Sequence, residues 1–385
     1  MRYIWHHIQT ILDNYSGGIP LSHFLKNYFR LHPKLGSRDR KIISEMAYSW
    51  YRCSRLLDDT MPLEQKIAGS LFLAETTNTH SLNFVPPDWR DKAHLPTSER
   101  IAFMNSQGVG IDILSLAPFT TNLSGGIEPE EWLTSMLTQP QLFIRIRKRG
   151  NEIKAILKDN GIEAEEVRPN TLALPNGSAI DKLLPQDSYV VQDLSSQQTG
   201  NYFYPKPGED WWDCCSGAGG KSLLLMDMQP GVQLTVSDKR QTILRNLVDR
   251  FSLYKHQQPA KYMLDAADEH ELQSKLGDRQ FDNIICDAPC SGSGTWARTP
   301  EQLFFFKEEY ISDFASLQQT IAGNTVRFLK SGGRLIYITC SVFRKENEAV
   351  VDAVIEQHKL TIEHQELING TERKADSMYI AVLRK

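Results

Sequence analysis

From about residue 190 to its end, the chain alternates short apolar runs with helical patterns, and this alternation limits the possible folds most strongly. Strand-like runs occur at Trp211 to Cys215, Gln233 to Ser237, Lys261 to Leu264, Phe281 to Cys286, Arg334 to Ile338 and Met378 to Leu383. Helical patterns lie between them, notably Thr242 to Phe251, Ile311 to Leu329 and Lys345 to Gln357. Strands that alternate with helices predict a doubly wound α/β sheet with helices on both faces.

Two regions of different character precede this one. Residues 1 to about 120 show helical spacing, as in Ile42, Ile43, Met46 and Ala47, and Ser37 is a candidate helix start. Residues 127 to 188 instead follow the order strand, helix, strand, strand, over Leu142 to Ile146, Glu152 to Asn160 (ended by Gly161), Ala164 to Val167 and Thr171 to Leu174.

Ser124-Gly125-Gly126 has the composition of a linker between these two regions. We therefore expect a helical domain over residues 1–122, a small α+β module over 123–188 and an α/β domain over 189–385.

The bulk composition is that of a soluble globular protein, with 385 residues, 41% hydrophobic and 23% charged. No apolar run is long enough to span a membrane, and the N-terminal residues lack the apolar core of a signal peptide. We therefore expect a cytoplasmic protein. The six cysteines are too sparse for a disulfide framework. Cys286 and Cys290 form one C-x3-C pair with no second pair, so we expect no metal, and Cys286 is predicted to point into a sheet core.

Basic residues gather in two places, although the net charge is -4. One cluster is Arg145-Ile146-Arg147-Lys148-Arg149, and the other spans Lys34 to Arg55 with aromatic residues among the cations. Such clusters fit a focused phosphate-binding face. They also fit ordinary solvated helix and strand faces, and charge alone leaves both interpretations open.

A glycine-rich loop, Asp213-Cys214-Cys215-Ser216-Gly217-Ala218-Gly219-Gly220-Lys221-Ser222, follows the first strand of the α/β region and opens a helix. Glycines let the backbone approach a ligand closely. The loop matches neither the G-x-G-x-x-G fingerprint nor the P-loop spacing, which argues against a dinucleotide or ATP site.

Acids follow four consecutive strands, at Asp213, Asp238, Asp265 and Asp287. Because the carboxyl ends of parallel strands share one edge, these acids are predicted to lie at the ligand-binding edge of the sheet.

Two cysteines follow strand-like runs rather than lying within them. They occur in Asp287-Ala288-Pro289-Cys290-Ser291-Gly292 and in Thr339-Cys340-Ser341, where the chain turns and side chains can reach a ligand. This placement indicates covalent chemistry on a bound substrate. The alternative is that both are inert small apolar residues, since free cysteine is often buried.

These motifs, with Glu346-Asn347-Glu348 after the second, resemble the signature of the NOL1/NOP2/Sun family of RNA cytosine-5 methyltransferases, and the bacterial ribosomal-RNA members match best. The glycine loop is similar to that family's D-x-C-A-A-P-G-G-K-T, and the resemblance covers essentially residues 190 to 385. More weakly, Ser37 to Arg55 is similar to a NusB-like helical RNA-binding domain, and Phe143 to Arg147 to the start of a small RNA-contacting module.

The sequence departs from the family pattern in two places. Ser216-Gly217-Ala218 stands where the family usually has Ala-Ala-Pro, a change that removes no backbone donor, so cofactor binding is expected to survive. Ala297-Arg298-Thr299-Pro300 replaces a usually Arg-rich stretch, which affects the expected details of RNA contact.

The resemblance implies a class I, Rossmann-like, S-adenosylmethionine-dependent methyltransferase domain. It implies that Cys340 attacks C6 of cytosine, that Cys290 helps release the methylated product and that Asp287 hydrogen-bonds the base near N3. Asp238 would hold the cofactor's ribose, and Asp265 would lie by its adenine. The remaining implied cofactor residues are the loop positions Cys215, Ser216, Gly217, Ala218, Gly219, Gly220 and Lys221, with Asp287 beside them.

The resemblance also implies an RNA partner, with 16S ribosomal RNA as the first candidate, and we expect a monomer with no membrane and no metal. Transfer RNA is an alternative substrate, and a non-catalytic RNA-binding ribosome-assembly factor is an alternative function. Methylation of an adenine or guanine nitrogen would need a polar-Pro-Pro-aromatic motif where this chain has Asp287-Ala288-Pro289-Cys290. A nicotinamide-dependent dehydrogenase is disfavoured by the missing G-x-G-x-x-G.

Overall fold

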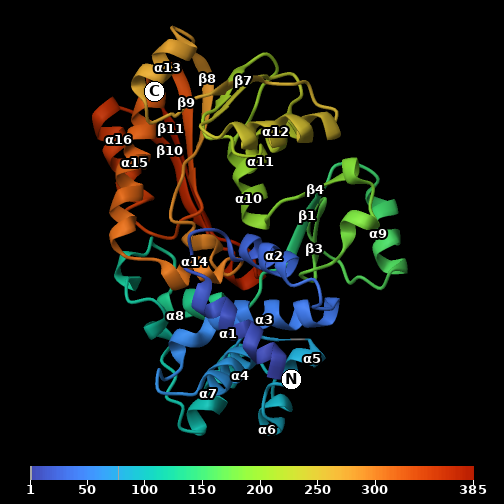
Figure 1. Cartoon of the computed structure of the whole chain (residues 1–385). Coiled ribbons are helices and arrows are strands. Elements are labelled where there is room, and N and C mark those ends of the chain that lie inside the picture. The colour runs from blue at the N-terminus through green and yellow to red at the C-terminus, as the bar shows by residue number, and fades with distance from the viewer. Residues whose placement is uncertain (1, 77) are drawn as a thin grey trace. The chain divides into compact units, whose positions relative to one another are not determined.

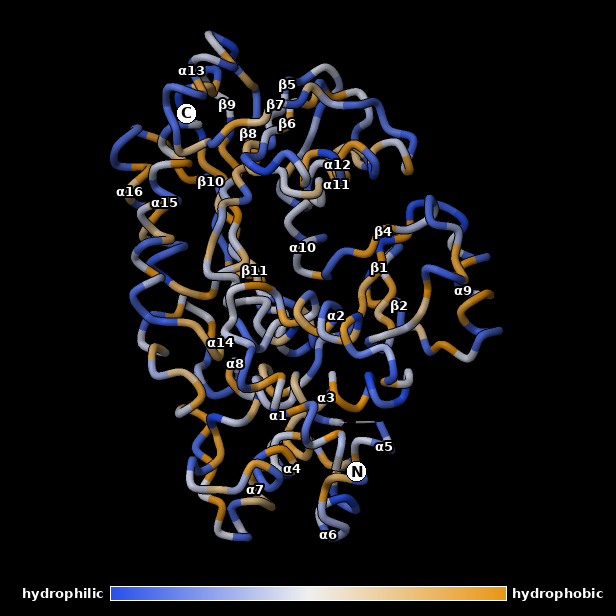
Figure 2. Tube along the Cα trace, in the orientation of Figure 1, coloured by the Kyte–Doolittle hydropathy of each residue, from blue (hydrophilic) through white to orange (hydrophobic). Residues whose placement is uncertain are grey.

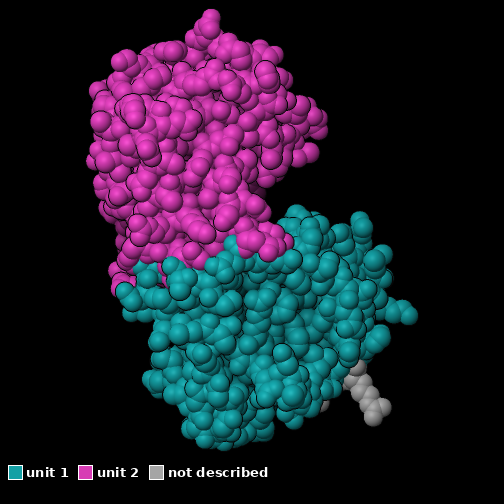
Figure 3. All heavy atoms as spheres, turned by 90° about the vertical axis from the view of Figure 1, so that its left-hand side faces the viewer, with its two compact units in different colours: residues 1–121, 127–140, 295–308 teal, residues 122–126, 141–294, 309–385 magenta. Residues whose placement is uncertain are grey.

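The computed structural model describes residues 2–76 and 78–385 (Figure 1). The chain forms two compact units, which Figure 3 colours separately. Unit 1 contains residues 1–121, 127–140 and 295–308, and unit 2 contains residues 122–126, 141–294 and 309–385. Each unit is therefore assembled from several segments of the chain, and the expected division into three consecutive domains stays a prediction.

Unit 1 is built from helices, which agrees with the helical spacing of residues 1 to 120. Its α-helices are α1 (Arg2–Asn14), α2 (Leu21–Leu31), α3 (Ser37–Cys53), α4 (Leu63–Leu73), α5 (Thr79–Leu82), α6 (Pro87–Arg90), α7 (Thr97–Ser106), α8 (Pro129–Met136) and α14 (Pro300–Phe305). Helix α3 begins at Ser37, as predicted, and buries Ile42, Ile43, Met46 and Ala47 on one face. The likeness of this unit to NusB stays a prediction.

The segment 295–308 completes the core of unit 1. Trp296 is fully buried, and its ring centroid lies 6.0 Å from that of Trp132 and 6.1 Å from that of Phe119. The buried Arg52 of α3 donates hydrogen bonds to the carbonyls of Met136, Thr138 and Ala297, at 2.6, 3.0 and 2.8 Å. Residues distant in sequence are thus required to fill and satisfy this helical core.

Unit 2 contains a mixed sheet whose strand order, within the described residues, is β10-β11-β9-β8-β5-β6-β7. Strands β5 to β9 run parallel to one another, and β11 runs antiparallel to β9 and β10. The strands are β5 (Asp210–Asp213), β6 (Gln233–Asp238), β7 (Ala260–Met263), β8 (Phe281–Asp287), β9 (Leu329–Thr339), β10 (Thr361–Ile368) and β11 (Met378–Arg384).

Helices cover both faces of this sheet, as predicted. They are α10 (Leu194–Gln198), α11 (Gly220–Met228), α12 (Gln241–Leu253), α13 (Glu269–Leu276), α15 (Glu309–Val326) and α16 (Glu348–His358). Successive side chains of a strand point to opposite faces. Accordingly, Trp212 packs in one core with Leu272 of α13 and Ile321 of α15, while Trp211 packs in the other with Leu247 of α12. Strand β8 contributes Ile284 to the first core and Ile285 to the second, and hydrophobic and hydrophilic colours alternate in the elements around these cores in Figure 2.

Unit 2 also holds a smaller antiparallel sheet of order β2-β3-β1-β4. It comprises β1 (Leu142–Ile146), β2 (Glu165–Arg168), β3 (Thr171–Leu174) and β4 (Tyr189–Val191), with α9 (Gly150–Asp159) packed against it. The predicted strand–helix–strand–strand order is correct, and β4 extends the sheet beyond residue 188.

Three features were not predicted from the sequence. Strand β10 was missed because it is an edge strand of mixed polarity, and β4 because it is short. The linker interpretation of Ser124-Gly125-Gly126 was incomplete, because Ser124 is buried and donates its N–H to the carbonyl of Val342 at 2.8 Å. None of the described helices combines the length and the apolar character needed to cross a membrane.

Candidate active site

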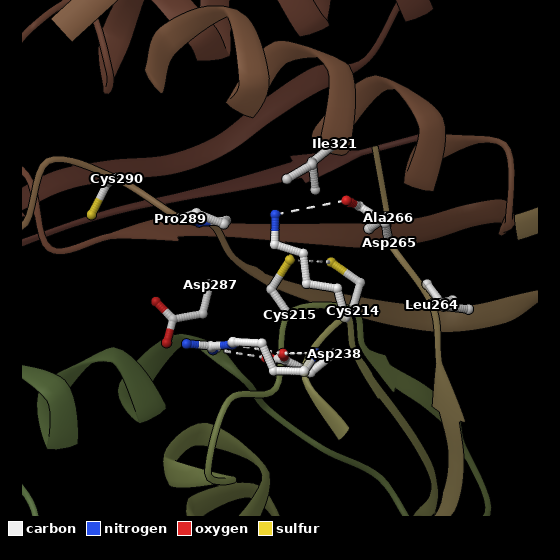
Figure 4. A pocket seen from close by; sticks show the side chains of 12 residues that line it. Cys214, Cys215, Asp238, Leu264, Asp265, Ala266, Asp287, Pro289, Cys290 and Ile321 are labelled. Carbon is white, nitrogen blue, oxygen red and sulfur yellow. Dashed lines mark hydrogen bonds and ion pairs between the residues drawn. The ribbon is translucent and has the colours of Figure 1, made fainter. Parts of the chain in front are cut away.

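A cavity of about 290 Å³ lies at the carboxyl edge of the large sheet in unit 2. Three of the four predicted acids line it, namely Asp238, Asp265 and Asp287, together with Cys215 and Cys290 (Figure 4). The remaining lining residues are Cys214, Lys239, Arg240, Leu264, Ala266, Pro289 and Ile321. The expectation that strand tips would bring these acids to one edge is confirmed for these three.

The fourth acid, Asp213, does not line the cavity. Its side chain is fully buried, and one carboxylate oxygen accepts a hydrogen bond of 2.6 Å from Ser222, while the other has no partner. Burial raises the pKa of Asp213 to about 7. Asp213 therefore belongs to the support of the glycine loop rather than to the cavity wall.

Of the glycine loop, Cys214 and Cys215 line the cavity, whereas the predicted positions 216–221 are not among its lining residues. Gly217 and Gly219 have φ angles of 51° and 82°, in the left-handed region that favours glycine. A Cβ atom on Gly219 would lie 2.9 Å from a carbon of Leu247, so α12 also packs too closely for a side chain there. Ser216 donates both its N–H and its hydroxyl to the carbonyl of Ser237, which holds the loop in place although it lacks the family's proline.

Asp238 links the loop to the next strand. It accepts hydrogen bonds from the N–H of Gly217 at 3.1 Å and from the guanidinium of Arg240 at 3.0 Å. Burial acts to raise the pKa of Asp238, but its hydrogen bonds to Arg240 and Gly217 outweigh burial and lower it. Asp265 is more exposed, and its carboxylate lies 3.7 Å from the ammonium of Lys239. Arg240 and Lys239 were not singled out from the sequence, where exposed cations after a strand carry little signal.

Lys221 and Asp287 form a partly buried ion pair, with 3.0 Å between Nζ and Oδ2. Burial alone would lower the pKa of Lys221, but attraction to Asp287, and then to Cys340 and Asp213, raises it. The lysine was predicted as a loop position, and its ion pair with Asp287 connects the glycine loop to the first cysteine motif.

Cys290 and Cys340 lie side by side, with 3.3 Å between their sulfur atoms. Their loops are 50 residues apart in sequence and follow the adjacent parallel strands β8 and β9. The hydrogen bond with Cys340 and burial raise the pKa of the Cys290 thiol well above its usual range. Cys286 is buried in the sheet core, as predicted.

Close backbone contacts hold these two loops together. The N–H of Gly294 donates to the carbonyl of Cys340 at 2.9 Å, and the N–H of Ser377 donates to the carbonyl of Gly294 at 2.9 Å. A Cβ atom on Gly294 would lie 2.0 Å from the carbonyl oxygen of Ser377, so only glycine fits. The hydroxyls of Ser291, Ser293 and Ser341 lie within 3.2 Å of one another.

The basic cluster at residues 145–149 does not form an open phosphate-binding face. Arg145 and Arg147 both pair with Asp227 of α11, at 2.6 and 2.7 Å, and the ring of His256 lies 2.8 Å from the same carboxylate. These four side chains are 9% to 14% exposed. Because the two arginines are largely buried and share one carboxylate, they are not presented on an open phosphate-binding face.

The second basic cluster is divided. Arg52 and Arg55 donate to backbone carbonyls of unit 1, whereas Lys34, Arg38 and Lys41 are exposed. A groove of about 710 Å³ between α2 and α3 is lined by Lys26, Arg30, Arg40, Phe29, Tyr48, Ser22, Leu25, Asn27, Pro33 and Ser44. None of these described lining residues is acidic. The sequence did not point to Lys26 and Arg30, which precede the cluster that we identified.

Comparison with known proteins gives a consistent result for the large sheet and its cavity. Residues 201–383 match the family described as 16S rRNA methyltransferase RsmB/F. A curated relative from Klebsiella pneumoniae, named ribosomal RNA small subunit methyltransferase B, is 27% identical over 237 residues, which are 59% of this chain and 54% of the relative. The chain thus spans about half the length of that relative.

Two solved structures share the fold. The structure of PH0851 has a TM-score of 0.73 at 18% identity and covers 95% of each chain. That of NSun6 from Pyrococcus horikoshii with SFG has a TM-score of 0.61 at 15% identity and covers 70% of this chain and 97% of that one. The mixed sheet of unit 2 fits a Rossmann-like methyltransferase fold, and the match of residues 201–383 to the 16S rRNA methyltransferase RsmB/F family supports the resemblance to the NOL1/NOP2/Sun family of RNA methyltransferases.

Proposed function

We propose that this protein transfers a methyl group from S-adenosylmethionine to C5 of a cytosine in RNA, with small-subunit ribosomal RNA as the substrate. The observation that carries the proposal is the contact of Cys290 with Cys340 beside the Lys221–Asp287 pair. The name of the curated relatives supports ribosomal RNA as the substrate. Two thiols in contact at a ligand-binding sheet edge suit a reaction that both forms and breaks a covalent bond to the base.

Cys340 is the proposed nucleophile and Cys290 the residue that assists release. C5 of cytosine is a poor nucleophile, and addition of a thiolate at C6 makes it enamine-like and able to accept a methyl group. Attraction to Asp287, and then to Cys340, raises the pKa of Lys221, which keeps a cation in the part of the site where Cys340 lies. Asp287 is placed to hydrogen-bond the base and to balance charge as the adduct forms.

The cavity residues fit the proposed cofactor. Asp238 and Asp265 line the cavity and offer carboxylates for hydroxyl and amino groups. The N–H of Gly217 donates to Asp238, so the glycine loop adjoins one of these carboxylates. Cys215 to Lys221 would hold the cofactor, Asp238 its ribose and Asp265 its adenine, with Asp287 between the cofactor and the base. When bound, S-adenosylmethionine supplies the electrophilic methyl group.

The groove between α2 and α3 is the proposed contact for unpaired RNA. Lys26, Arg30 and Arg40 would meet phosphates, and Phe29 and Tyr48 offer faces on which bases stack. The guanidinium of Arg40 already lies 6.0 Å from the ring centroid of Phe29. This assignment agrees with the NusB-like RNA-binding role expected of the helical region.

The first test measures methyl transfer from labelled S-adenosylmethionine to bacterial RNA, both naked and in ribosomal particles. We expect 5-methylcytosine with the natural protein, none with Cys340→Ala and a trapped protein–RNA adduct with Cys290→Ala. Cys53→Ala is the matched control, because Cys53 is a buried thiol of unit 1, and this variant is expected to retain activity. Full activity of Cys340→Ala would contradict the role of the nucleophile. Label confined to transfer RNA would change the substrate, and no label on any RNA would favour the non-catalytic assembly factor.

A further inference from the structure

Glu346 is a fully buried carboxylate in the connection between β9 and α16. It accepts hydrogen bonds from the N–H of Ser291 at 2.8 Å, from Nε2 of Gln318 at 2.9 Å and from the hydroxyl of Ser341 at 2.7 Å. These donors are neutral and come from three different segments of unit 2. A buried carboxylate is costly unless its oxygens are satisfied by such donors, so its position is closely determined.

The donors belong to the two cysteine loops. Ser291 directly follows Cys290, and Ser341 directly follows Cys340. Gln318 of α15 strengthens the connection, since its Nε2 also donates to the carbonyl of Pro289 at 2.9 Å. One carboxylate therefore ties together the two loops whose sulfur atoms lie 3.3 Å apart.

Asn347 adds a second tie on the Cys340 loop alone. Its side chain accepts from the hydroxyl of Thr339 at 2.6 Å and donates to the carbonyl of Ser341 at 2.9 Å. It also donates to the hydroxyl of Ser124 at 2.9 Å. The contacts of Asn347 hold one cysteine loop in shape, whereas those of Glu346 join both loops.

We propose that Glu346 is a positioning residue for the two-cysteine reaction, which holds the loops of Cys290 and Cys340 in contact and places a negative charge beside Cys290. This inference rests on the proposed function, in which Cys340 adds to the base and Cys290 assists release. Glu346 itself does not line the cavity, so it acts through the two loops and not on the cofactor.

The charge of Glu346 matters for the protonation of Cys290. The hydrogen bond with Cys340, burial, the charge of Cys340 and then that of Glu346 raise the pKa of the Cys290 thiol. Tyr337 of β9 interacts with Cys290 electrostatically, and Asp287 lines the same cavity as Cys290. Removing the charge of Glu346 is expected to lower the pKa of Cys290 and to ionise this thiol at a lower pH.

The release step shows why a protonated Cys290 is useful. The C5–H bond breaks, its electron pair forms the C5–C6 double bond, and the proton passes to water. The bond from C6 to the sulfur of Cys340 breaks and leaves its electron pair on that sulfur as a thiolate. The thiol of Cys290 stabilises this thiolate by donating a hydrogen bond across the observed contact.

The first experiment uses the full chain without RNA or cofactor. Cys340→Ser isolates Cys290, and the rate at which iodoacetamide alkylates Cys290 is followed against pH by mass spectrometry. Adding Glu346→Gln removes the charge but keeps the hydrogen bonds, because the glutamine amide can donate to Ser341, whose hydroxyl can accept. We expect the alkylation midpoint to fall by roughly one pH unit. An unchanged midpoint would overturn the electrostatic part of the inference.

Glu348→Gln is the matched control, since Glu348 lies two residues from Glu346 and accepts a hydrogen bond of 2.9 Å from Ser124. We expect its alkylation midpoint to equal that of the parent protein. A shift in this control as large as that of Glu346→Gln would show a general effect of local charge and would overturn the specific role of Glu346.

The second experiment measures turnover. Glu346→Ala is expected to lower kcat about 100-fold with KM for S-adenosylmethionine unchanged, and Glu346→Asp to restore part of the loss. Glu346→Gln should lose activity and accumulate the covalent protein–RNA adduct at alkaline pH, where Cys290 is ionised. Circular dichroism verifies that each variant is folded. Equal kcat values for Glu346→Ala and the natural protein would overturn the inference. The alkylation experiment does not depend on catalysis, so failure of the proposed function is distinguishable from failure of this one.

Discussion

The basic residues of the two units use their charge in different ways. In unit 2, Arg145 and Arg147 are paired with the single carboxylate of Asp227 and are largely buried. In unit 1, Lys26, Arg30 and Arg40 line a groove without acidic neighbours among its described lining residues. The comparison teaches that a basic cluster in sequence becomes a binding surface only where folding brings no carboxylate to it.

The largest effect on stability is expected from removing the carboxylate that pairs with both Arg145 and Arg147. Asp227→Ala leaves Arg145, Arg147 and His256 without their common acceptor, and we expect a loss of about 3–5 kcal/mol in the free energy of unfolding. Urea denaturation of the full chain measures this loss. Arg149→Ala is the control, because Arg149 is exposed and lies 4.0 Å from Glu152, and it should change stability by less than about 0.5 kcal/mol. A similar change for both variants would contradict the prediction.

The next largest loss of stability is expected from replacing Arg52, a buried cation of unit 1. Arg52→Met keeps much of the side-chain volume but leaves the carbonyls of Met136, Thr138 and Ala297 without their donor. We expect a loss of about 2–3 kcal/mol, because buried acceptors lose their partners. Thermal and urea unfolding measure it. An unchanged stability would mean that water reaches these carbonyls and that Arg52 resembles the exposed cations of the groove.

Asp213 contrasts with Asp227, because its buried carboxylate accepts a hydrogen bond from the neutral Ser222 and not from a cation. Its pKa is raised from 3.8 to about 7, so the unfolded chain releases this proton first as the pH increases. Its contribution to stability is therefore fully present below pH 3.8 and is lost as the pH rises through 7. Asp213→Asn does not titrate, and its free energy of unfolding relative to the natural protein should rise by about 2–3 kcal/mol from pH 5 to pH 8.

Denaturation of both proteins without cofactor, at pH 5 and at pH 8, tests this prediction. The difference between the two pH values is the relevant quantity, since it cancels any cost of the lost hydrogen bond with Ser222. A difference that does not change with pH would show that Asp213 is ionised throughout this range.

The smallest effect on stability is expected in the groove. Arg30→Ala and Lys26→Ala remove exposed cations and should each change the free energy of unfolding by less than about 0.5 kcal/mol. The affinity for single-stranded RNA falls as the salt concentration rises, and each substitution should make the slope of log affinity against log salt concentration less steep by about 0.7. Fluorescence anisotropy over a salt series measures the slope. An unchanged slope for both variants would remove the groove from the proposed RNA interface.

Much of unit 2 follows directly from local sequence pattern. The runs that end at Asp238 and Asp287 form β6 and β8, and the glycine loop opens α11. Strand β10 escaped prediction because an edge strand shows only weak alternation. In unit 1, the requirement for Trp296 could not be predicted, because a helical pattern does not reveal which distant segment fills its core.

For the candidate site, the sequence by itself determined the chemical groups and the strand ends that carry them. Parallel strands end at one edge, so Asp287, Cys290 and Cys340 had to lie near one another once β8 and β9 were adjacent. Only the tertiary structure decided how these groups are held and which charges remain available. Glu346 meets Ser291 across 55 residues and Arg147 meets Asp227 across 80. Such pairings depend on packing between elements, and local periodicity carries no information about them.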